Sequence, residues 1–412
     1  MKQRMDMAFP ILAIMLLAVS SAQSSNLTGQ NATSPFNLTT PYPISATGQQ
    51  CVAYNGYIYC IGGYTDHGYV NFSYYSTVNS SGIGRWMNTT PFPVNVTNPA
   101  CVSSNGYIYC IGFSNTNITE SYYARINGSG IGQWALTSGI PKPLSGETCT
   151  SVNSTIYCIG GLNPTLKQEI RSTSSVYYAA LDKFGIGPWN TTAGYPYIIT
   201  GESCPSSGST IYCIGGLFSY SIVNKSFYAG ASSSGISRWT GSTPYPISVN
   251  NALCSIYNGY VFCISGSSSE SPSVNFTYYA PISSTGMLQW TAGKPFPTNQ
   301  TLSSCPAYDG YVYCIGPGST SYTNATYFAF LPALTANYTS PSTTVTTSIR
   351  LTTIPSQINQ TTVQGQTTTI SSDQSSAGGG SLIVQLVIVA AIIIAIYAWI
   401  RIRGRSATNE KQ

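Results

Sequence analysis

Between residues 34 and 335, short β-rich stretches alternate with clusters of Gly, Asn, Ser and Pro, and no stretch has helical periodicity. The most regular stretch runs Cys-Val-Ala-Tyr-Asn-Gly-Tyr-Ile-Tyr-Cys over 51–60. Its midpoint, Asn55-Gly56, favours a two-residue hairpin turn. Folding the chain about this turn places Cys51 opposite Cys60. The pattern therefore predicts an antiparallel β-hairpin over 51–60.

The same hairpin pattern recurs six times, because all twelve cysteines fall into pairs with identical spacing. The pairs are Cys51/Cys60, Cys101/Cys110, Cys149/Cys158, Cys204/Cys213, Cys254/Cys263 and Cys305/Cys314. Counting outward from the turn puts each pair at a non-hydrogen-bonded position, where Cα atoms lie about 4.5 Å apart. That separation is near the lower end of the range that a disulfide spans. We therefore predict six disulfides, each inside its own hairpin, and none between repeats.

The hairpin is the first part of a repeat of 48 to 55 residues. In the first repeat it is followed by Gly62-Gly63, the aromatic pair Tyr74-Tyr75, Trp86 and Pro91-Phe92-Pro93. A period near 50 residues with four short strands per repeat indicates a β-propeller. We expect the hairpin to form the two inner strands, the aromatic pair to lie on the third, and the tryptophan to begin the outermost. The repeated aromatic residues are then packing residues between blades.

The run Ile58-Tyr59-Cys60-Ile61-Gly62-Gly63 resembles the Kelch strand that ends in a double glycine and is followed by a tyrosine and a tryptophan. The resemblance to Kelch repeats covers roughly residues 34–333. Phe113, Ser265 and Pro317 replace one glycine of the pair in repeats two, five and six. The resemblance implies an all-β, Kelch-like propeller.

The two ends of the repeat region complement each other. The sixth repeat contains Tyr327-Phe328 but no following tryptophan, whereas Phe36 lies 15 residues before Cys51, the same distance as Trp86 before Cys101. The N-terminal segment therefore supplies the missing outer strand of the sixth repeat. We predict a six-bladed propeller over 34–335 that its N-terminal strand closes into a ring.

The flanking segments predict a membrane-anchored surface protein. Residues 1–22 have the charged start, apolar run and small-residue cleavage pattern of a signal peptide, and 23–33 form a linker. Residues 336–380 are rich in Ser and Thr and predict an extended stalk. The apolar run 381–400 is long enough to cross a bilayer, and the arginines in the tail, 401–412, place that end in the cytoplasm. The expected topology is single-pass type I, at the cell membrane, with the propeller outside.

An extracellular position agrees with the disulfides. It also agrees with about seventeen Asn-x-Ser/Thr sequons in the chain. The glycosylation candidates are Asn71, Asn88, Asn117, Asn190, Asn275 and Asn324. Glycans would be attached to some of these side chains.

Composition argues against nucleic-acid binding and against several kinds of catalysis. Only 7% of residues are charged, and His67 is the sole histidine. One histidine does not supply a multi-histidine metal site, and a sialidase-like site would need converging arginines, of which the propeller region has four. We therefore expect no metal, no cofactor and no enzymatic activity.

Four residues are candidates for ligand binding. Glu147 and Glu202 each stand two residues before the first cysteine of repeats three and four, at the entry to the innermost strands. They are either solvated carboxylates or a polar, cation-binding patch at the mouth of the central channel. Asp66 and His67 lie in the variable loop between the second and third strands of repeat one, where recognition residues are commonly found.

These observations favour a non-catalytic surface receptor or adhesin that binds a protein or a glycan. Two alternatives remain open: a structural component of a cell envelope, and a carbohydrate-active enzyme. Glycan binding would favour the first interpretation, self-association the second, and turnover of a glycan the third.

Overall fold

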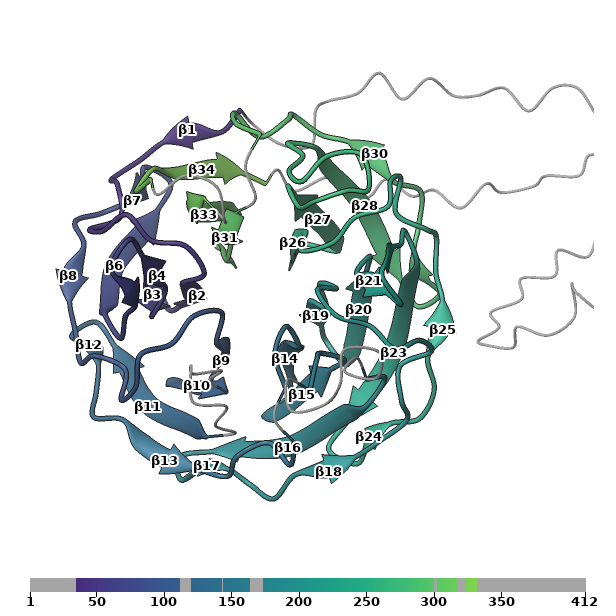
Figure 1. Cartoon of the computed structure of the whole chain (residues 1–412), viewed down its shortest axis with the longest axis horizontal. Helices are drawn as coiled ribbons and strands as arrows, with labels where there is room; N and C mark the ends of the chain where they lie inside the picture. The colour runs from purple at the N-terminus through teal and green to yellow at the C-terminus, as the bar shows by residue number, and fades with distance from the viewer. Residues whose placement is uncertain are drawn as a thin grey trace, which may run out of the picture. The chain divides into compact units, whose positions relative to one another are not determined.

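A computed structural model describes residues 35–111, 120–142, 144–163, 173–299, 302–317 and 323–331. Within these ranges all regular structure is β, and the strands form six blades around a central axis (Figure 1). The predicted six-bladed propeller is therefore confirmed. The predicted signal peptide, stalk and membrane span lie outside the described residues, and no helix among the residues that are described is long and apolar enough to cross a bilayer.

Blade one shows how each repeat folds. Its inner strands β2 (Gln50–Tyr54) and β3 (Tyr57–Ile61) form the cysteine hairpin, and β6 (Ser73–Asn79) pairs with β3. The outer edge has two short segments, β7 (Gly82–Ile83) and β8 (Met87–Asn88), which both pair with β6. The single outer strand expected from the sequence is thus interrupted, because the chain leaves the sheet between these two segments.

The other blades repeat this order. Blade two contains β9 (Ala100–Ser104), β10 (Tyr107–Ile111), β11 (Ser121–Asn127), β12 (Gly130–Ile131) and β13 (Ala135–Thr137). Blade three contains β14 (Thr148–Val152), β15 (Thr155–Ile159), β16 (Val176–Asp182), β17 (Gly185–Ile186) and β18 (Asn190–Thr191). Blade four contains β19 (Ser206–Ser207), β20 (Thr210–Ile214), β23 (Ser226–Ser232), β24 (Gly235–Ile236) and β25 (Thr240–Gly241). Blade five contains β26 (Leu253–Tyr257), β27 (Tyr260–Ile264), β28 (Thr277–Ser283), β29 (Gly286–Met287) and β30 (Thr291–Ala292).

Blade six is assembled from both ends of the repeat region. It contains β31 (Leu302–Ser304), β32 (Ala307–Tyr308), β33 (Tyr311–Pro317), β34 (Thr326–Phe330) and, as its outer strand, β1 (Asn37–Leu38). Asn37 pairs with Phe328 and Leu38 with Tyr327. Figure 1 shows the N-terminal strand β1, in purple, beside the green β34. The predicted closure of the ring is confirmed.

The hairpin register is also as predicted. Cys51 pairs with Cys60, and the turn residues Asn55 and Gly56 have φ angles of 48° and 80°, in the left-handed region that Asn and Gly tolerate. All six disulfides form within their hairpins, with Cα–Cα distances between 4.0 and 4.2 Å. No free cysteine remains.

Hydrogen bonds from repeated side chains join neighbouring blades. The Nε1 atom of Trp134 donates to the backbone carbonyl of Thr90 in blade one at 3.3 Å. The hydroxyl of Thr89 accepts from the backbone N–H of Ile131 at 2.7 Å, and the hydroxyl of Tyr59 donates to the carbonyl of Asn127 at 2.9 Å. Equivalent bonds from tryptophan recur at Trp86, Trp189, Trp239 and Trp290. The expected packing role of these aromatic residues is confirmed.

The antiparallel strands give the ring two different faces. We call the "turn face" the end that carries the two-residue turns such as Asn55-Gly56, together with the turns after each third strand. The "loop face" is the opposite end, where the double glycines and the loops between second and third strands lie. Two small hairpins stand on the loop face, β4–β5 (Tyr64–Thr65 and Gly68–Tyr69) and β21–β22 (Leu217–Phe218 and Ser221–Ile222).

Candidate functional site

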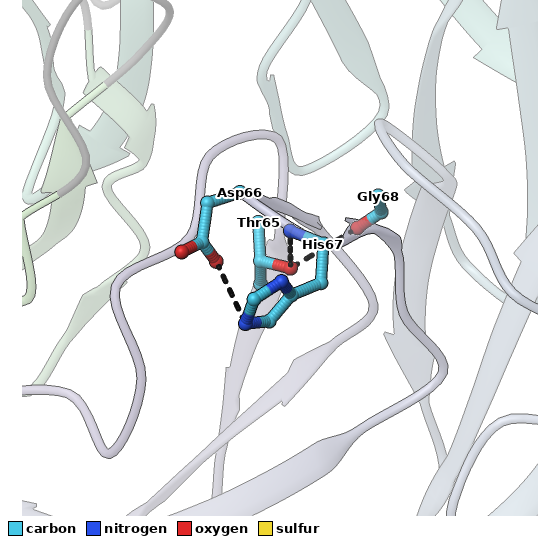
Figure 2. A network of polar contacts seen from close by, with 4 residues as sticks. All are labelled: Thr65, Asp66, His67 and Gly68. Atoms are coloured by element: carbon cyan, nitrogen blue, oxygen red, sulfur yellow. Dashed lines mark hydrogen bonds and ion pairs between the residues drawn. The ribbon is translucent and has the colours of Figure 1, made fainter.

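Asp66 and His67 form the tip of the β4–β5 hairpin on the loop face. Figure 2 shows the backbone N–H of His67 donating to the hydroxyl of Thr65 (3.2 Å), which in turn donates to the carbonyl of Gly68 (3.3 Å). The His67 Nε2 and Asp66 Oδ1 atoms are 3.6 Å apart, but the two side chains are 89% and 70% exposed. An ion pair this open to water contributes little. The network fixes the turn, and the structure does not bring these two residues together with Glu147 or Glu202.

Glu147 and Glu202 lie next to each other over the double glycine of blade three. A Cβ atom on Gly160 would be 2.7 Å from Glu202 Oε1, and one on Gly161 would be 2.9 Å from Glu147 Cβ. Glu202 is only 5% exposed, and neither of its carboxylate oxygens accepts a hydrogen bond from a described residue. Glu147 is partly buried. Of the two alternatives that the sequence left open, solvated carboxylates do not describe Glu202, and the cation-binding patch stays a prediction.

This burial changes the protonation of both side chains. Desolvation raises the pKa of Glu147 to about 7, partly offset by its own backbone N–H. Desolvation, with a smaller contribution from the neighbouring Glu147 carboxylate, raises the pKa of Glu202 to about 8. The hydroxyl of Tyr195 is buried and has no hydrogen-bond partner among the described residues, and its pKa is raised by burial and then by Glu202. Near neutral pH, Glu202 is therefore mostly a neutral carboxylic acid.

A neutral side chain occupies the same position three blades away. Gln49 stands two residues before Cys51, is 1% exposed, and covers Gly316 as Glu202 covers Gly160. Seven residues before Gln49 lies the buried Tyr42, just as Tyr195 lies seven residues before Glu202. The hydroxyl of Tyr42 and the amide of Gln49 also have no partner among the described residues. Because Gln49 has the shape of a protonated glutamate, the two positions share a structural role between blades.

The glycosylation candidates divide into two groups. Asn71 and Asn275 are partly buried, and their Nδ2 atoms donate to the carbonyls of Phe92 (3.1 Å) and Phe296 (3.2 Å). A glycan would have to project from those same nitrogen atoms. Asn88 and Asn190 are exposed on outer strands, and Asn324 is exposed beside β34. Asn190 also donates its Nδ2, to the carbonyl of Pro188 at 3.2 Å, so exposure and not hydrogen bonding separates the two groups. Asn117 lies outside the described residues.

A cavity of about 960 Å³ opens on the turn face across blades two, three and four. Its lining comes from the two-residue turns and from the ends of the third strands. Apart from Ala180, Leu181 and Ala231, every lining side chain is a hydroxyl or an amide: Ser104, Asn105, Ser151, Asn153, Ser154, Thr155, Ser209, Ser232 and Ser233. No ionisable side chain belongs to the lining. The sequence interpretation placed recognition on the loops of the opposite face and missed this cavity.

The loop between the second and third strands of blade three lies largely outside the described residues, which end at 163 and resume at 173. Among the residues that are described, no group of three or more His, Cys, Asp or Glu side chains is placed to hold a metal ion.

Comparisons with known proteins bear on the fold. No family model matches the sequence, and no curated protein matches it. A solved structure described as "Structure of YjhT" is similar, with a TM-score of 0.57 and 12% sequence identity over 72% of this chain and 97% of that chain. At this identity the likeness extends to the fold alone, and it supports the six-bladed β-propeller.

Proposed function

We propose that this chain is a cell-surface, Kelch-like propeller, anchored by its C-terminal helix, that binds an extracellular protein or glycan without catalysis. The disulfides are consistent with an oxidising, extracellular location. The apolar run over 381–400 and the arginines after it support the anchor. The rigid ring then presents its faces to a ligand outside the cell.

The cavity on the turn face is the observation that carries this proposal. It has the volume of a ligand site, and its lining offers hydrogen-bond donors and acceptors without a general acid or base. Such a lining fits recognition and supplies no group for proton transfer.

The test is a glycan array together with a cross-linking pull-down, both on the full-length chain. A saturable glycan or protein ligand is the expected result. Self-association without any other ligand would instead favour a structural role in a cell envelope. Failure to bind any ligand or to self-associate would refute the proposal.

The carboxylate pair favours one second candidate, a carbohydrate-active enzyme. Glu147 and Glu202 have pKa values near 7 and 8, and hydrolysis of a glycosidic bond uses two carboxyl groups with one of them protonated. The shared role of Glu202 and Gln49 weighs against this candidate. Turnover of a glycan by the full-length chain that is lost in Glu147→Gln would establish it; absence of turnover over a broad substrate panel would remove it.

A further inference from the structure

We propose that the cavity on the turn face binds an uncharged oligosaccharide, which would sit against the hydroxyl-rich turns of blades two to four and the exposed ring of Phe184. This inference rests on the proposed binding function and names the chemistry of its ligand.

The cavity lies over blades that include three and four, and these two blades lack an aromatic ring that the other blades have. In blade one, Tyr57 lies 6.3 Å from Tyr59 and 6.4 Å from Tyr75, between ring centroids, so three rings form a cluster near the turn face. Blades two, five and six have the same cluster of three, built on Tyr107, Tyr260 and Tyr311.

In blades three and four only two of the three rings remain. Tyr157 and Tyr178 are stacked 5.9 Å apart, and Tyr212 and Tyr228 6.5 Å apart. Thr155 holds the position of the third ring in blade three, and Thr210 holds it in blade four. Thr155 itself lines the cavity. The loss of the third ring is therefore confined to blades three and four, while the cavity also extends over Ser104 and Asn105 of blade two, which keeps its third ring.

The lining matches a neutral, polyhydroxylated ligand. Each Ser or Thr hydroxyl can donate and accept a hydrogen bond, and each Asn amide can do both, as can the hydroxyls of a sugar. The cavity has no ionisable side chain to pair with a carboxylate, sulfate or ammonium group. Within the lining, a charged group would lose hydration without a compensating partner, whereas a neutral one would exchange water hydrogen bonds for similar bonds to protein. Lys183 lies outside the lining, against the ring of Phe184.

Phe184 adds an apolar surface on the turn face, outside the residues that line the cavity. It lies in the turn between β16 and β17, three residues after the cavity-lining Leu181, and is 75% exposed with Lys183 Nζ 5.0 Å from its ring centroid. The same turn position holds Ser81, Ser129, Ser234 or Thr285 in the other blades whose turn is described. The exposed ring of Phe184 suits the apolar face of a sugar ring.

The experiment measures binding of a panel of neutral oligosaccharides, with sialylated and sulfated oligosaccharides as charged counterparts, to the full-length chain. We expect a neutral member to bind with saturation. Phe184→Ser, which introduces the serine found at this turn position in blades one, two and four, should weaken binding about tenfold. Thr155→Tyr, which restores the third ring, should abolish binding, and it should fold because Tyr57 and Tyr107 occupy that position in blades one and two.

Tyr220→Asn is the matched control, since it removes an exposed aromatic residue from a hairpin on the loop face. It should leave the affinity unchanged. The inference is overturned if Thr155→Tyr and Phe184→Ser both bind as the original chain does, or if only charged oligosaccharides bind. Capture of a protein ligand with no oligosaccharide binding would overturn this inference while leaving the proposed binding function intact.

Discussion

At the scale of single residues, the same position in the repeat can hold a neutral or an ionisable group. Gln49 and Glu202 both fill the space over the first glycine of the preceding blade, and both are buried. Only the glutamate can lose a proton there, and the charge would be placed close to Glu147. The free energy of unfolding should therefore depend on pH, although only 7% of the residues in this chain are charged.

We expect the free energy of unfolding to fall as pH rises from about 4.5 to about 8. The folded chain keeps the protons of Glu147 and Glu202 up to pH values near 7 and 8, while the unfolded chain loses them near 4.5. Glu202→Gln should reduce this slope and raise stability at pH 8 by on the order of a few kcal/mol, since each pKa unit corresponds to about 1.4 kcal/mol. Denaturant unfolding at pH 5 and pH 8 measures the effect.

Gln49→Glu is the reciprocal control. It should lower stability at pH 8 more than at pH 5, because it buries a second ionisable group at the equivalent position. Identical pH slopes for the original chain and Glu202→Gln would contradict the role assigned to Glu202.

At the scale of strands and hairpins, each disulfide acts within one blade. The second cysteine of every pair is fully buried, so the bonds form part of the packed interior: Cys60, Cys110, Cys158, Cys213, Cys263 and Cys314. The bonds hold β2 to β3 and their counterparts, while contacts between blades depend on aromatic packing and hydrogen bonds. The disulfides therefore stabilise each hairpin, whereas aromatic packing and hydrogen bonds stabilise the contacts between blades.

Replacing both Cys101 and Cys110 by Ala should lower the free energy of unfolding by about 2–3 kcal/mol from lost loop constraint, with a further cost for the space left in the interior. Thermal unfolding under oxidising conditions would measure this loss. A non-reducing peptide map should recover the other five bonds in their own hairpins. A bond between hairpins would contradict the local pairing.

The hairpins could be predicted because their register depends on residues close in sequence. The Asn55-Gly56 turn fixes which residues face each other, so the pairing of Cys51 with Cys60 follows from local chemistry alone. The burial of Glu202 could not be predicted in this way, because it depends on Gly160 in another blade. The cavity was missed because the absence of the third ring in blades three and four becomes visible only when Thr155 is compared with Tyr57 across repeats.

At the scale of the whole molecule, the ring has six inter-blade junctions, and one of them joins segments from opposite ends of the propeller. The hydroxyl of Thr39 accepts from the N–H of Ile83 at 2.8 Å, as the hydroxyl of Thr89 accepts from the N–H of Ile131 at 2.7 Å within the continuous chain. The equal spacing of Phe36 and Trp86 from their cysteines predicted this equivalence.

Thr39→Val and Thr89→Val should therefore destabilise the protein equally, by about 1–3 kcal/mol, because each leaves one buried backbone N–H without its partner. Chemical unfolding of both variants provides the comparison. A neutral effect of Thr39→Val beside a clear loss for Thr89→Val would mean that the ring is open in solution.

The pairing of β1 with β34 also determines how the propeller responds to mechanical load. The two strands are antiparallel, so the start of β1 and the end of β34 lie at the same edge of blade six. Tension between the two ends of the propeller would separate Asn37 from Phe328 and then Leu38 from Tyr327, one pair after another, which is the weak direction of a β-ladder. Tension through the C-terminal end alone passes into β34, where the ladders with β33 and β1 both resist it. The ring closure is therefore weaker against a load applied to both ends of the propeller than against a load applied to the C-terminal end alone.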